Sequence, residues 1–445
     1  MTFEQGLSGL NSASRNLEII GNNVSNANTV GFKTATAQFS DVFARSFSDN
    51  SGVSIGRGTT LDNVSQNFSQ GNVTPTNNPL DMAINGRGFF KMKTTLDETL
   101  YTRNGQFSVS GEGIIQNVQG AQLLGYPYDL ETGFVTGVET PIQFPQQAIA
   151  PKTTSEVAMK FNLDSRELPV VESKPFDISD ITSYSHTLAT TVYDQLGVDH
   201  SVAVYFQKTS NPTASADVTA LSDAGATTFY NVYATIDGKL ITPGNVAATD
   251  PPTPLKVIGF LQDGSFPSFP EGTDPLPFEP KMNLSLTEVQ VAEDGSTFGG
   301  DIALDFSGST QFGSKFGVNS VTQDGYQSAS LSSFSITPEG VLRGRYANGQ
   351  TQDLAQISLV TFRNPDALRP AGNNSYIKTA AAGTEFLARD DDTSTSSITS
   401  GALESANLDL TVELVNIISA QRIYQANAQT VKAQDSILQT LVNLR

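Results

Sequence analysis

Few residues in this sequence have the type and spacing that catalysis or ligand binding requires. The clearest candidate for a catalytic residue is a serine between two glycines. The stretch Gly52–Gly56, GVSIG, has the G-x-S-x-G spacing of a nucleophile elbow, which would support acyl transfer from the Ser54 hydroxyl. Such an elbow needs a strand before it, a helix after it and an Asp–His pair downstream. Polar, loop-forming residues flank this stretch on both sides. The surroundings therefore favour a chance match, and we predict no catalytic residue.

Metal and cofactor sites are poorly supported as well. His186 and His200 are the only histidines, and no H-x-x-x-H or EF-hand spacing accompanies them, so we expect surface or half-buried side chains on strands. Asp390–Asp392 lies in a Ser/Thr-rich connector, where a solvated linker is the simpler interpretation and cation binding the weaker one. Gly86–Gly88 and Gly111–Gly113 complete no dinucleotide fingerprint. We predict no metal, no cofactor and no enzymatic activity.

Composition narrows the class of protein. A chain of 445 residues with 38% hydrophobic content predicts two to four domains with ample core. The formal charge of −19 argues against nucleic acid, since no basic surface is available to neutralise phosphates. No apolar run is long enough for a membrane span, and the N-terminus lacks the pattern of a cleavable secretory signal. The absence of Cys excludes disulfides and thiolate chemistry.

The last stretch, from Leu403 to Arg445, is the element around which the chain is organised. It contains neither Gly nor Pro, and steps of four and three residues give an apolar heptad seam that only a helix places on one face. A second apolar stripe, which includes Val412, Val415 and Ile423, lies beside this seam. Two apolar faces on one helix imply neighbours on two sides. The seam consists of Leu410, Leu414, Ile417, Gln421, Tyr424, Ala428, Val431, Asp435, Leu438 and Val442.

The first residues show the same spacing, so we predict a second amphipathic helix that ends near Gly21–Asn23. Its seam consists of Phe3, Leu7, Leu10, Ser14, Leu17, Gly21 and Val24. The two helices can pair within one chain and close a domain, or they can pack against other copies. Heptad pattern alone leaves both possibilities open.

The residues between the helices predict mainly β structure. Residues 34–70 have too little apolar content for a core and form a connector. Alternating stretches and turn signals in 71–147 and 327–400 predict an inner β domain with strands from both segments. Residues 148–326, interrupted by many prolines, predict an inserted outer β domain, and Lys152–Asp324 carries a net charge of −13 (22 acidic and 9 basic residues). The terminal segments carry almost no net charge, which suits assembly, whereas the acidic insertion suits exposure to solvent.

The asparagine-rich stretch Asn22–Lys33, together with both terminal helices, resembles the signature of the bacterial flagellar axial proteins, which form rod, hook and hook-associated structures. The stretches Leu80–Phe90 and Tyr101–Val109 are similar to the inner β domain of rod and hook subunits. Residues 334–374 and the two ends of the last helix resemble the hook family in particular. The resemblance covers about half of the chain, and the insertion adds little to it.

This resemblance implies a structural subunit that assembles into a flexible tubular universal joint and transmits torque from rod to filament. It implies a multidomain α+β fold, with a coiled-coil-like pair of terminal helices (1–33 and 401–445) and nested all-β domains between them. The implied partners are copies of itself, the distal rod and hook–filament junction proteins, the hook cap and the flagellar export apparatus, with no nucleic acid and no membrane. The implied location is the extracellular hook, reached without a cleaved signal peptide.

The seam residues are the expected assembly interface: Phe3, Leu7, Leu10, Leu17, Val24, Leu410, Leu414, Ile417, Tyr424, Val431, Leu438 and Val442. Two alternatives stay open. A distal rod subunit shares both ends and the inner domain, although the large insertion favours the hook. A secreted adhesin or hydrolase would instead have its activity in 148–326, and a pocket with convergent polar groups there would support it.

Overall fold

The computed structural model describes residues 3–42, 58–129, 135–171, 174–212, 215–242, 252–267, 279–285, 298, 300–387 and 396–443. Its chain separates into two compact units. Unit 1 consists of Met1–Gln146, Leu331–Arg345 and Gly349–Arg445, and unit 2 consists of Gln147–Ser330 and Tyr346–Asn348. Terminal helices with β sheets between them confirm the expected fold class. The finer division of unit 1 into helical, connector and β parts remains a prediction.

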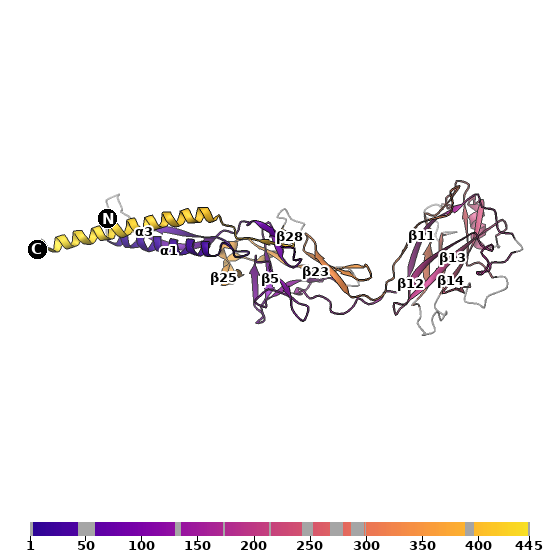
Figure 1. Ribbon diagram of the computed structural model, residues 1–445, viewed down its shortest axis with the longest axis horizontal. Coiled ribbons are helices and arrows are strands. Elements are labelled where there is room, and N and C mark those ends of the chain that lie inside the picture. Colours follow the sequence, from indigo (N-terminus) through magenta and orange to yellow (C-terminus); the bar gives the residue numbers. More distant parts are fainter. Residues whose placement is uncertain are drawn as a thin grey trace. The chain divides into compact units, whose positions relative to one another are not determined.

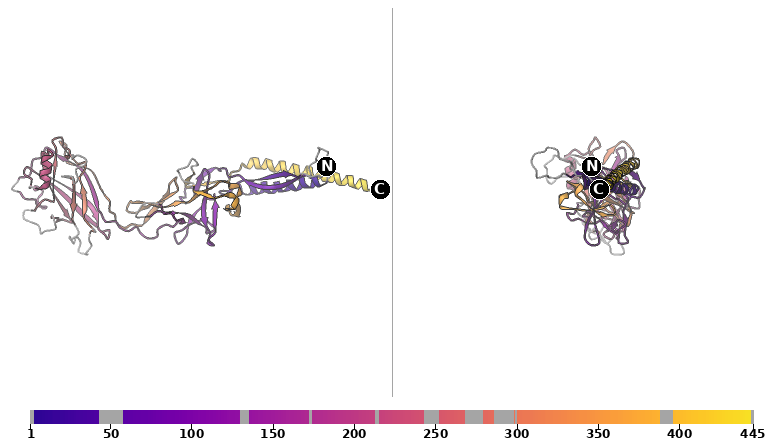
Figure 2. Two further views of the ribbon diagram at one scale, coloured as in Figure 1. Left: turned by 180° about the vertical axis from the view of Figure 1, so that it is seen from behind. Right: turned by 90° about the vertical axis from the view of Figure 1, so that its left-hand side faces the viewer.

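The terminal helices of unit 1 lie side by side (Figures 1 and 2). Helix α1 spans Phe3–Ser25 and helix α3 spans Leu410–Asn443. The prediction of a last helix from Leu403 onward was wrong at its beginning, because Ala402–Glu404 is strand β29 and pairs with β3 (Val73–Pro75). Helix α3 begins only after Asp409, whose Oδ1 accepts a hydrogen bond from Thr411 N at 2.8 Å. Heptad spacing does not locate such a cap.

The central sheet of unit 1 draws its strands from both sides of the insertion. Strand β5 (Phe89–Lys93) pairs with β24 (Leu359–Phe362), and β9 (Gln122–Pro127) pairs with β23 (Thr351–Ile357). The remaining strands of this 13-stranded sheet are β6 (Thr99–Thr102), β7 (Ser108–Val109), β8 (Ile115–Gln116), β10 (Thr140–Pro141), β21 (Leu331–Ile336), β22 (Val341–Tyr346), β25 (Arg369–Gly372), β26 (Ser375–Ile377) and β27 (Glu385–Leu387).

Shorter pairings tie the ends of unit 1 to this sheet. Strand β28 (Ser397–Ser400) pairs with β4 (Met82–Asn85), next to the β29–β3 pair. Strands β1 (Ala35–Asp41) and β2 (Thr59–Gln66) form a separate antiparallel ribbon. The 3-10 turns η2 (Pro365–Ala367) and η3 (Ala380–Ala382) connect the last strands of the sheet. The chain leading into α3 is therefore fixed to the β part of unit 1 by backbone hydrogen bonds.

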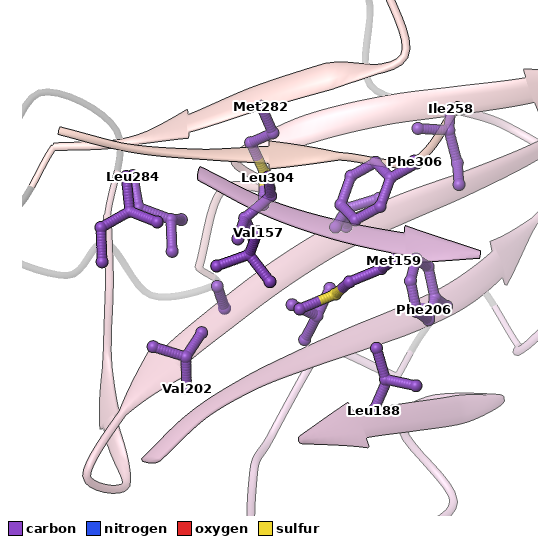
Figure 3. Close-up of a cluster of buried hydrophobic side chains, with 14 of the residues drawn as sticks. Val157, Met159, Leu188, Val202, Phe206, Ile258, Met282, Leu284, Leu304 and Phe306 are labelled. Carbon is purple, nitrogen blue, oxygen red and sulfur yellow. The ribbon is translucent and has the colours of Figure 1, made fainter. Parts of the chain in front are cut away.

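Unit 2 contains two five-stranded sheets that share one apolar core. One sheet contains β11 (Glu156–Asp164), β17 (Lys281–Leu284), β18 (Ile302–Asp305), β19 (Thr310–Phe312) and β20 (Gly317–Gln323). The other contains β12 (His186–Tyr193), β13 (Asp199–Thr209), β14 (Thr228–Ile236), β15 (Lys239–Leu240) and β16 (Lys256–Phe260), and helix α2 (Ala216–Asp223) packs beside β16. Figure 3 shows core side chains of both sheets, among them Val157, Phe206 and Phe306. Alternation along β13 points Val202, Val204 and Phe206 inward.

The two histidines lie in unit 2, and the expectation for His200 was wrong. Its side chain is buried because it lies between two turns, with Nδ1 2.7 Å from Asp237 Oδ2 and Nε2 3.6 Å from Asp194 Oδ2. His186 is half-buried as expected; it stacks on Phe316, and burial lowers its pKa. The GVSIG stretch and Asp390–Asp392 lie outside the described residues.

Among the described residues, no group of three or more His, Cys, Asp or Glu side chains could hold a metal ion. None of the helices in the described part of the chain combines the length and the apolar character that a membrane span needs.

Asp324 holds the start of β11 in place through its side chain. Its carboxylate accepts hydrogen bonds from Ser155 N, Ser155 Oγ and Glu156 N at 2.7–3.0 Å, and Lys152 Nζ lies 3.1 Å away. Burial acts to raise the pKa of Asp324, but these bonds outweigh burial and hold the pKa below its usual range. The folded state therefore binds fewer protons than the unfolded state, and the resulting stability is present above about pH 4 and lost as pH falls further.

We expect Asp324→Asn to lower the free energy of unfolding of unit 2 by about 1–3 kcal/mol at pH 7. The wild type should converge on the variant on acidification below about pH 4, since protonation removes the same interaction. Hydrogen exchange of the β11 and β20 amides in the full chain, followed from pH 7 to pH 3, measures both effects. Equal protection of wild type and variant at pH 7 would contradict the prediction.

Candidate assembly surface of the terminal helices

The face of α1 that contacts α3 consists mainly of small side chains. Gly6, Ala13 and Ile20 are buried along it at seven-residue intervals, with Gly9 between the first two. A Cβ atom added to Gly6 would lie 2.9 Å from Val431 Cγ2, and one added to Gly9 would lie 2.9 Å from Asn427 Nδ2. Both distances are shorter than a carbon contact allows. The glycines therefore permit a closer approach of the two helix backbones than any larger residue would.

The contacts along the pair show that the helices run in opposite directions. Gly6 lies against Val431 and Gly9 against Asn427, whereas Asn23 Nδ2 near the end of α1 donates to Glu413 Oε1 at 3.2 Å near the start of α3. On α3 the contacting face therefore runs from Glu413 through Ala420, which is only 2% exposed, to Val431. The heptads left open whether the two helices pair within one chain or pack against other copies, and the structure shows the pairing within one chain.

The pairing leaves the larger apolar side chains of α3 uncovered within one chain. Val415 is 59% exposed and Leu414 is 47% exposed, in a helix that contributes little to any core. Soluble monomers rarely present so much contiguous apolar surface without a partner for it. The other exposed apolar side chains of the pair are Phe3, Leu7, Leu410, Val412, Ile418, Ile423, Tyr424, Ile437 and Leu438.

Helix α3 also extends past the start of α1. Because Gly6 lies opposite Val431 and α1 begins at Phe3, the residues of α3 from about Asp435 onward have no α1 residue beside them. Figures 1 and 2 show α3 continuing beyond the N-terminal label. Ile437 and Leu438 on this extension are 54% and 50% exposed. The final turns of α3 are therefore without apolar cover among the described residues.

The structure divides the twelve seam residues that the sequence selected. Leu10, Leu17 and Val24 of α1 and Ile417 and Val431 of α3 are partly buried within one chain. The side chain of Val442 lies outside the described part. The others are exposed and available to a second molecule: Phe3, Leu7, Leu410, Leu414, Tyr424 and Leu438. Their role in assembly stays a prediction.

Sequence reasoning missed the close-packed face, because a heptad search favours large apolar residues. The available signal was the recurrence of small residues at Gly6, Gly9 and Ala13 on α1. Small residues at intervals of three and four are the pattern by which helix backbones approach closely. The predicted seam on α1 lies one residue along the helix from this face, which rotates it partly toward solvent.

The β1–β2 ribbon packs on α1 through polar contacts. Ser8 Oγ accepts a hydrogen bond from Thr59 N at 2.9 Å, and the Ser12 and Thr59 hydroxyls lie 2.8 Å apart. Asn23 donates to Ala35 O at 2.9 Å and accepts from Ala35 N at 3.0 Å. Since Asn23 also contacts Glu413, one amide joins α1, the ribbon and α3. These bonds hold the ribbon while contributing little apolar burial.

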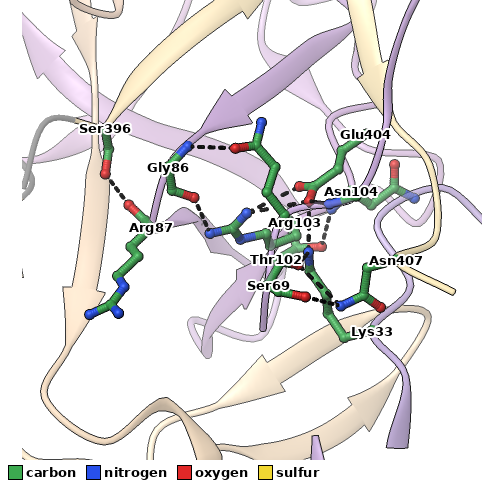
Figure 4. A network of polar contacts seen from close by, with 12 residues as sticks. Lys33, Ser69, Gly86, Arg87, Thr102, Arg103, Asn104, Ser396, Glu404 and Asn407 are labelled. Carbon is green, nitrogen blue, oxygen red and sulfur yellow. Dashed lines mark hydrogen bonds and ion pairs between the residues drawn. The ribbon is translucent and has the colours of Figure 1, made fainter. Parts of the chain in front are cut away.

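A buried ion cluster joins the helices to the β part of unit 1 (Figure 4). Glu404, at the end of β29, lies 2.7 Å from Lys33 Nζ and 3.2 Å from Arg103 Nη1, and all three side chains are 0–1% exposed. Gly71 N donates to the same carboxylate at 2.7 Å. Lys33 follows α1 and Arg103 follows β6, so one carboxylate binds segments up to 371 residues apart.

The cluster contains two cations and one carboxylate, and its electrostatics reflect this imbalance. Burial lowers the pKa of Lys33, and the neighbouring Arg103 charge lowers it further, while the hydrogen bond and charge of Glu404 act in the opposite direction. Arg103 makes additional contacts, because Nη2 donates to Gly86 O at 2.7 Å and its guanidinium lies 5.7 Å from the centre of the Phe89 ring. Such a cluster favours a single arrangement of its three segments.

Four family models match consecutive parts of the chain. Residues 3–33 match the Flagella basal body rod protein model, and residues 83–158 match the Flagellar hook protein FlgE/F/G D1 domain. Residues 162–326 match the Flagellar basal body protein FlaE D2 domain, and residues 399–444 match the Flagellar basal body rod FlgEFG protein C-terminal model.

Curated relatives are similar along the whole chain. The flagellar hook protein FlgE of Salmonella typhimurium strain LT2 is 37% identical over 100% of both chains, and that of Escherichia coli K12 is 36% identical over the same extent. The flagellar hook protein FlgE of Treponema pallidum is 28% identical over 99% of this chain and 98% of its own. The crystal structure of Helicobacter pylori flagellar hook protein FlgE2 covers 75% of this chain and 100% of its own, with a TM-score of 0.50. At 14% identity this last likeness supports the fold alone.

Proposed function

We infer that this chain, which belongs to the flagellar hook protein family and is a structural subunit of the bacterial flagellar hook, assembles with copies of itself through the helix faces that its own fold leaves exposed. The observation that carries this inference is the apolar surface of α3, where Leu414, Val415 and Ile423 are about half exposed within one chain. Burial of such surface contributes about 25 cal/mol per Å². Neighbouring helix pairs fit this surface, because Leu414 belongs to the heptad seam and Val415 and Ile423 belong to the apolar stripe beside it.

In the assembly that we propose, the small-residue face joins α1 to α3 inside one copy and the large apolar residues join neighbouring copies. The exposed members of the seam provide the second kind of contact: Phe3, Leu7, Leu410, Leu414, Tyr424 and Leu438. Side-by-side helices resist shear, whereas polar contacts elsewhere can exchange between arrangements of similar energy. A tube built in this way would transmit torque while it bends, which is the universal-joint behaviour that we expect of a hook.

Further partners and the route of export belong to the same proposal. The chain is a component of the flagellar rod and hook assembly. We propose contacts with distal rod, hook–filament junction and cap proteins at the ends of the tube, and export through the flagellar apparatus to the cell exterior. Residues 1–445 contain no Cys, which suits passage of an unfolded chain because no disulfide can form on the way.

Electron microscopy of the purified full chain at increasing concentration tests the proposal. We expect tubes above a critical concentration and monomers below it. Hydrogen exchange should show weaker protection of α3 in the dilute monomer than in the tubes, because pairing with α1 alone leaves most of the apolar surface of α3 uncovered. A chain that remains monomeric at every concentration, or an α3 equally protected in both states, would contradict assembly through these helices.

Deletion of unit 2 gives a further prediction. The chain leaves and returns side by side, since Ile149 N donates to Ala329 O at 2.9 Å and Lys152 pairs with Tyr326. Paired residues lie about 5 Å apart, so joining Ile149 to Ala329 through two glycines should preserve unit 1. We expect the shortened chain to fold and form tubes of altered curvature or strength, visible by electron microscopy. A shortened chain that folds but never assembles would show that unit 2 is required for assembly.

A further inference from the structure

Unit 1 contains a cavity of about 960 Å³ that the proposed helix contacts do not use. Its walls come from the segment after β2, the turn around Arg87, and the segment 361–366 at the end of β24. Aromatic side chains of Phe68, Phe89 and Phe362 form part of the lining. A cavity of this volume exceeds what a single carboxylate or a small anion would fill, and suits several residues of a polypeptide.

The charged residues of this cavity are predominantly basic. Arg87 and Arg363 line it as exposed side chains, and Arg103 lines it as a buried one, against a single lining carboxylate at Asp366. This is unusual in a chain with a formal charge of −19. The local excess of positive charge therefore distinguishes the cavity from the acidic chain around it.

Arg103 is the residue that most clearly indicates a missing ligand. Its side chain is 1% exposed, and its Nε has no hydrogen-bond partner among the described residues. It also shares its one carboxylate, Glu404, with Lys33, so the buried cluster beside the cavity has one cation in excess. A buried cation is costly unless it is paired, and an incoming carboxylate would supply the missing charge.

We propose that this cavity receives an acidic segment of a second copy of the chain, with Arg87 and Arg363 recognising its carboxylates and Arg103 supplying charge at depth. The inference rests on the proposed self-assembly, and it adds a charge-selective contact to the apolar helix contacts. Arginine suits this role because its planar guanidinium binds a carboxylate through two parallel hydrogen bonds.

Two observations favour a second copy as the occupant. The lining includes Thr36, Ser65 and Gln66 of the β1–β2 ribbon, and this ribbon packs on α1, one of the two helices assigned to assembly. Each copy is also strongly acidic and therefore offers complementary carboxylates. The chain's own Asp390–Asp392 lies outside the described residues and is the alternative that the experiment has to separate.

The first test compares two double charge reversals in the full chain. R87E/R363E changes the cavity, whereas R345E/R369E makes the same change in charge at exposed arginines of unit 1 outside the cavity. We expect R87E/R363E to raise the critical concentration for tube formation at least tenfold, and R345E/R369E to change it less than twofold. Equal effects of the two pairs would overturn the proposal. If the wild type itself forms no tubes, the proposed function fails first, so the two failures are distinguishable.

The second test identifies the occupant. The chain has no Cys, so Asp366→Cys, which keeps the three arginines of the cavity, provides a single thiol for a benzophenone photocrosslinker. We expect crosslinks in tubes that join two copies and map by mass spectrometry to an acidic segment, and we expect their loss on dilution to monomers. Crosslinks confined to one chain, at Asp390–Asp392 for example, would overturn the proposal. Millimolar inorganic phosphate that raises the monomer Tm, without any effect of R87E/R363E on assembly, would overturn it in favour of a small-anion site.

Discussion

Leu414→Asp should abolish tube formation while leaving the unfolding of the monomer unchanged. Leu414 is 47% exposed within one chain and does not lie on the face that contacts α1, so a carboxylate there remains hydrated in the monomer. In the proposed tube the same carboxylate would be enclosed by neighbouring helices without a partner. Burial of an unpaired charge costs several kcal/mol, and each 1.4 kcal/mol is a factor of about ten in an equilibrium constant. We therefore expect a critical concentration raised about 100-fold or more.

Pelleting of tubes and thermal unfolding of the dilute monomer measure the two halves of this prediction. The matched control is Gln425→Asp, which introduces the same charge at an exposed position of α3 that is already polar, and which should assemble nearly as well as the wild type. A monomer Tm that falls sharply in Leu414→Asp would show that this residue packs within its own chain. Normal assembly of Leu414→Asp would remove Leu414 from the interface.

The sequence predicted the existence of both helices, because heptad spacing sustained over many turns places apolar residues on one face only in a helix. It did not predict which face α1 and α3 share. That face depends on Gly6, Gly9 and Ala420, whose small side chains carry almost no hydrophobic signal yet permit the closest backbone approach. Large apolar residues determine the pattern in a sequence, whereas steric fit determines which face closes first.

In the β structure, too, pairs of strands that are neighbours in sequence could be predicted, whereas pairs that are far apart in sequence could not. The β12–β13 hairpin and the inward side chains of β13 follow from the local alternation of apolar residues, because neighbouring strands and a short turn are local features. The pairing of β5 with β24 joins segments about 270 residues apart and follows from tertiary packing that no local pattern encodes. His200 was misjudged for the same reason, since its partners Asp194 and Asp237 belong to two separate turns.

The buried ion cluster is the most important feature that the sequence did not predict, and the second prediction concerns its carboxylate. Glu404 was assigned to the terminal helix, where a carboxylate would usually face solvent, yet it is fully buried between Lys33 and Arg103. Glu404→Gln keeps the shape of the side chain but leaves two buried cations without an anion. We expect it to lower the free energy of unfolding of unit 1 by about 3–5 kcal/mol, which urea unfolding of the full chain at pH 7 would measure.

Lys33→Met tests the other side of the cluster. We expect it to lower the free energy of unfolding by less than about 1 kcal/mol, because it leaves one cation for one carboxylate. It also replaces a buried ammonium group by an apolar side chain of similar length. The pKa of Lys33 is lowered by burial and by Arg103, so below its usual value near 10.5 the folded state binds fewer protons than the unfolded state. Wild-type stability should therefore increase through Lys33 as the pH rises toward about 10.5, and Lys33→Met should lose this increase. Equal destabilisation by Glu404→Gln and Lys33→Met, with the same pH dependence as the wild type, would show that the cluster needs both cations and is not one charge in excess.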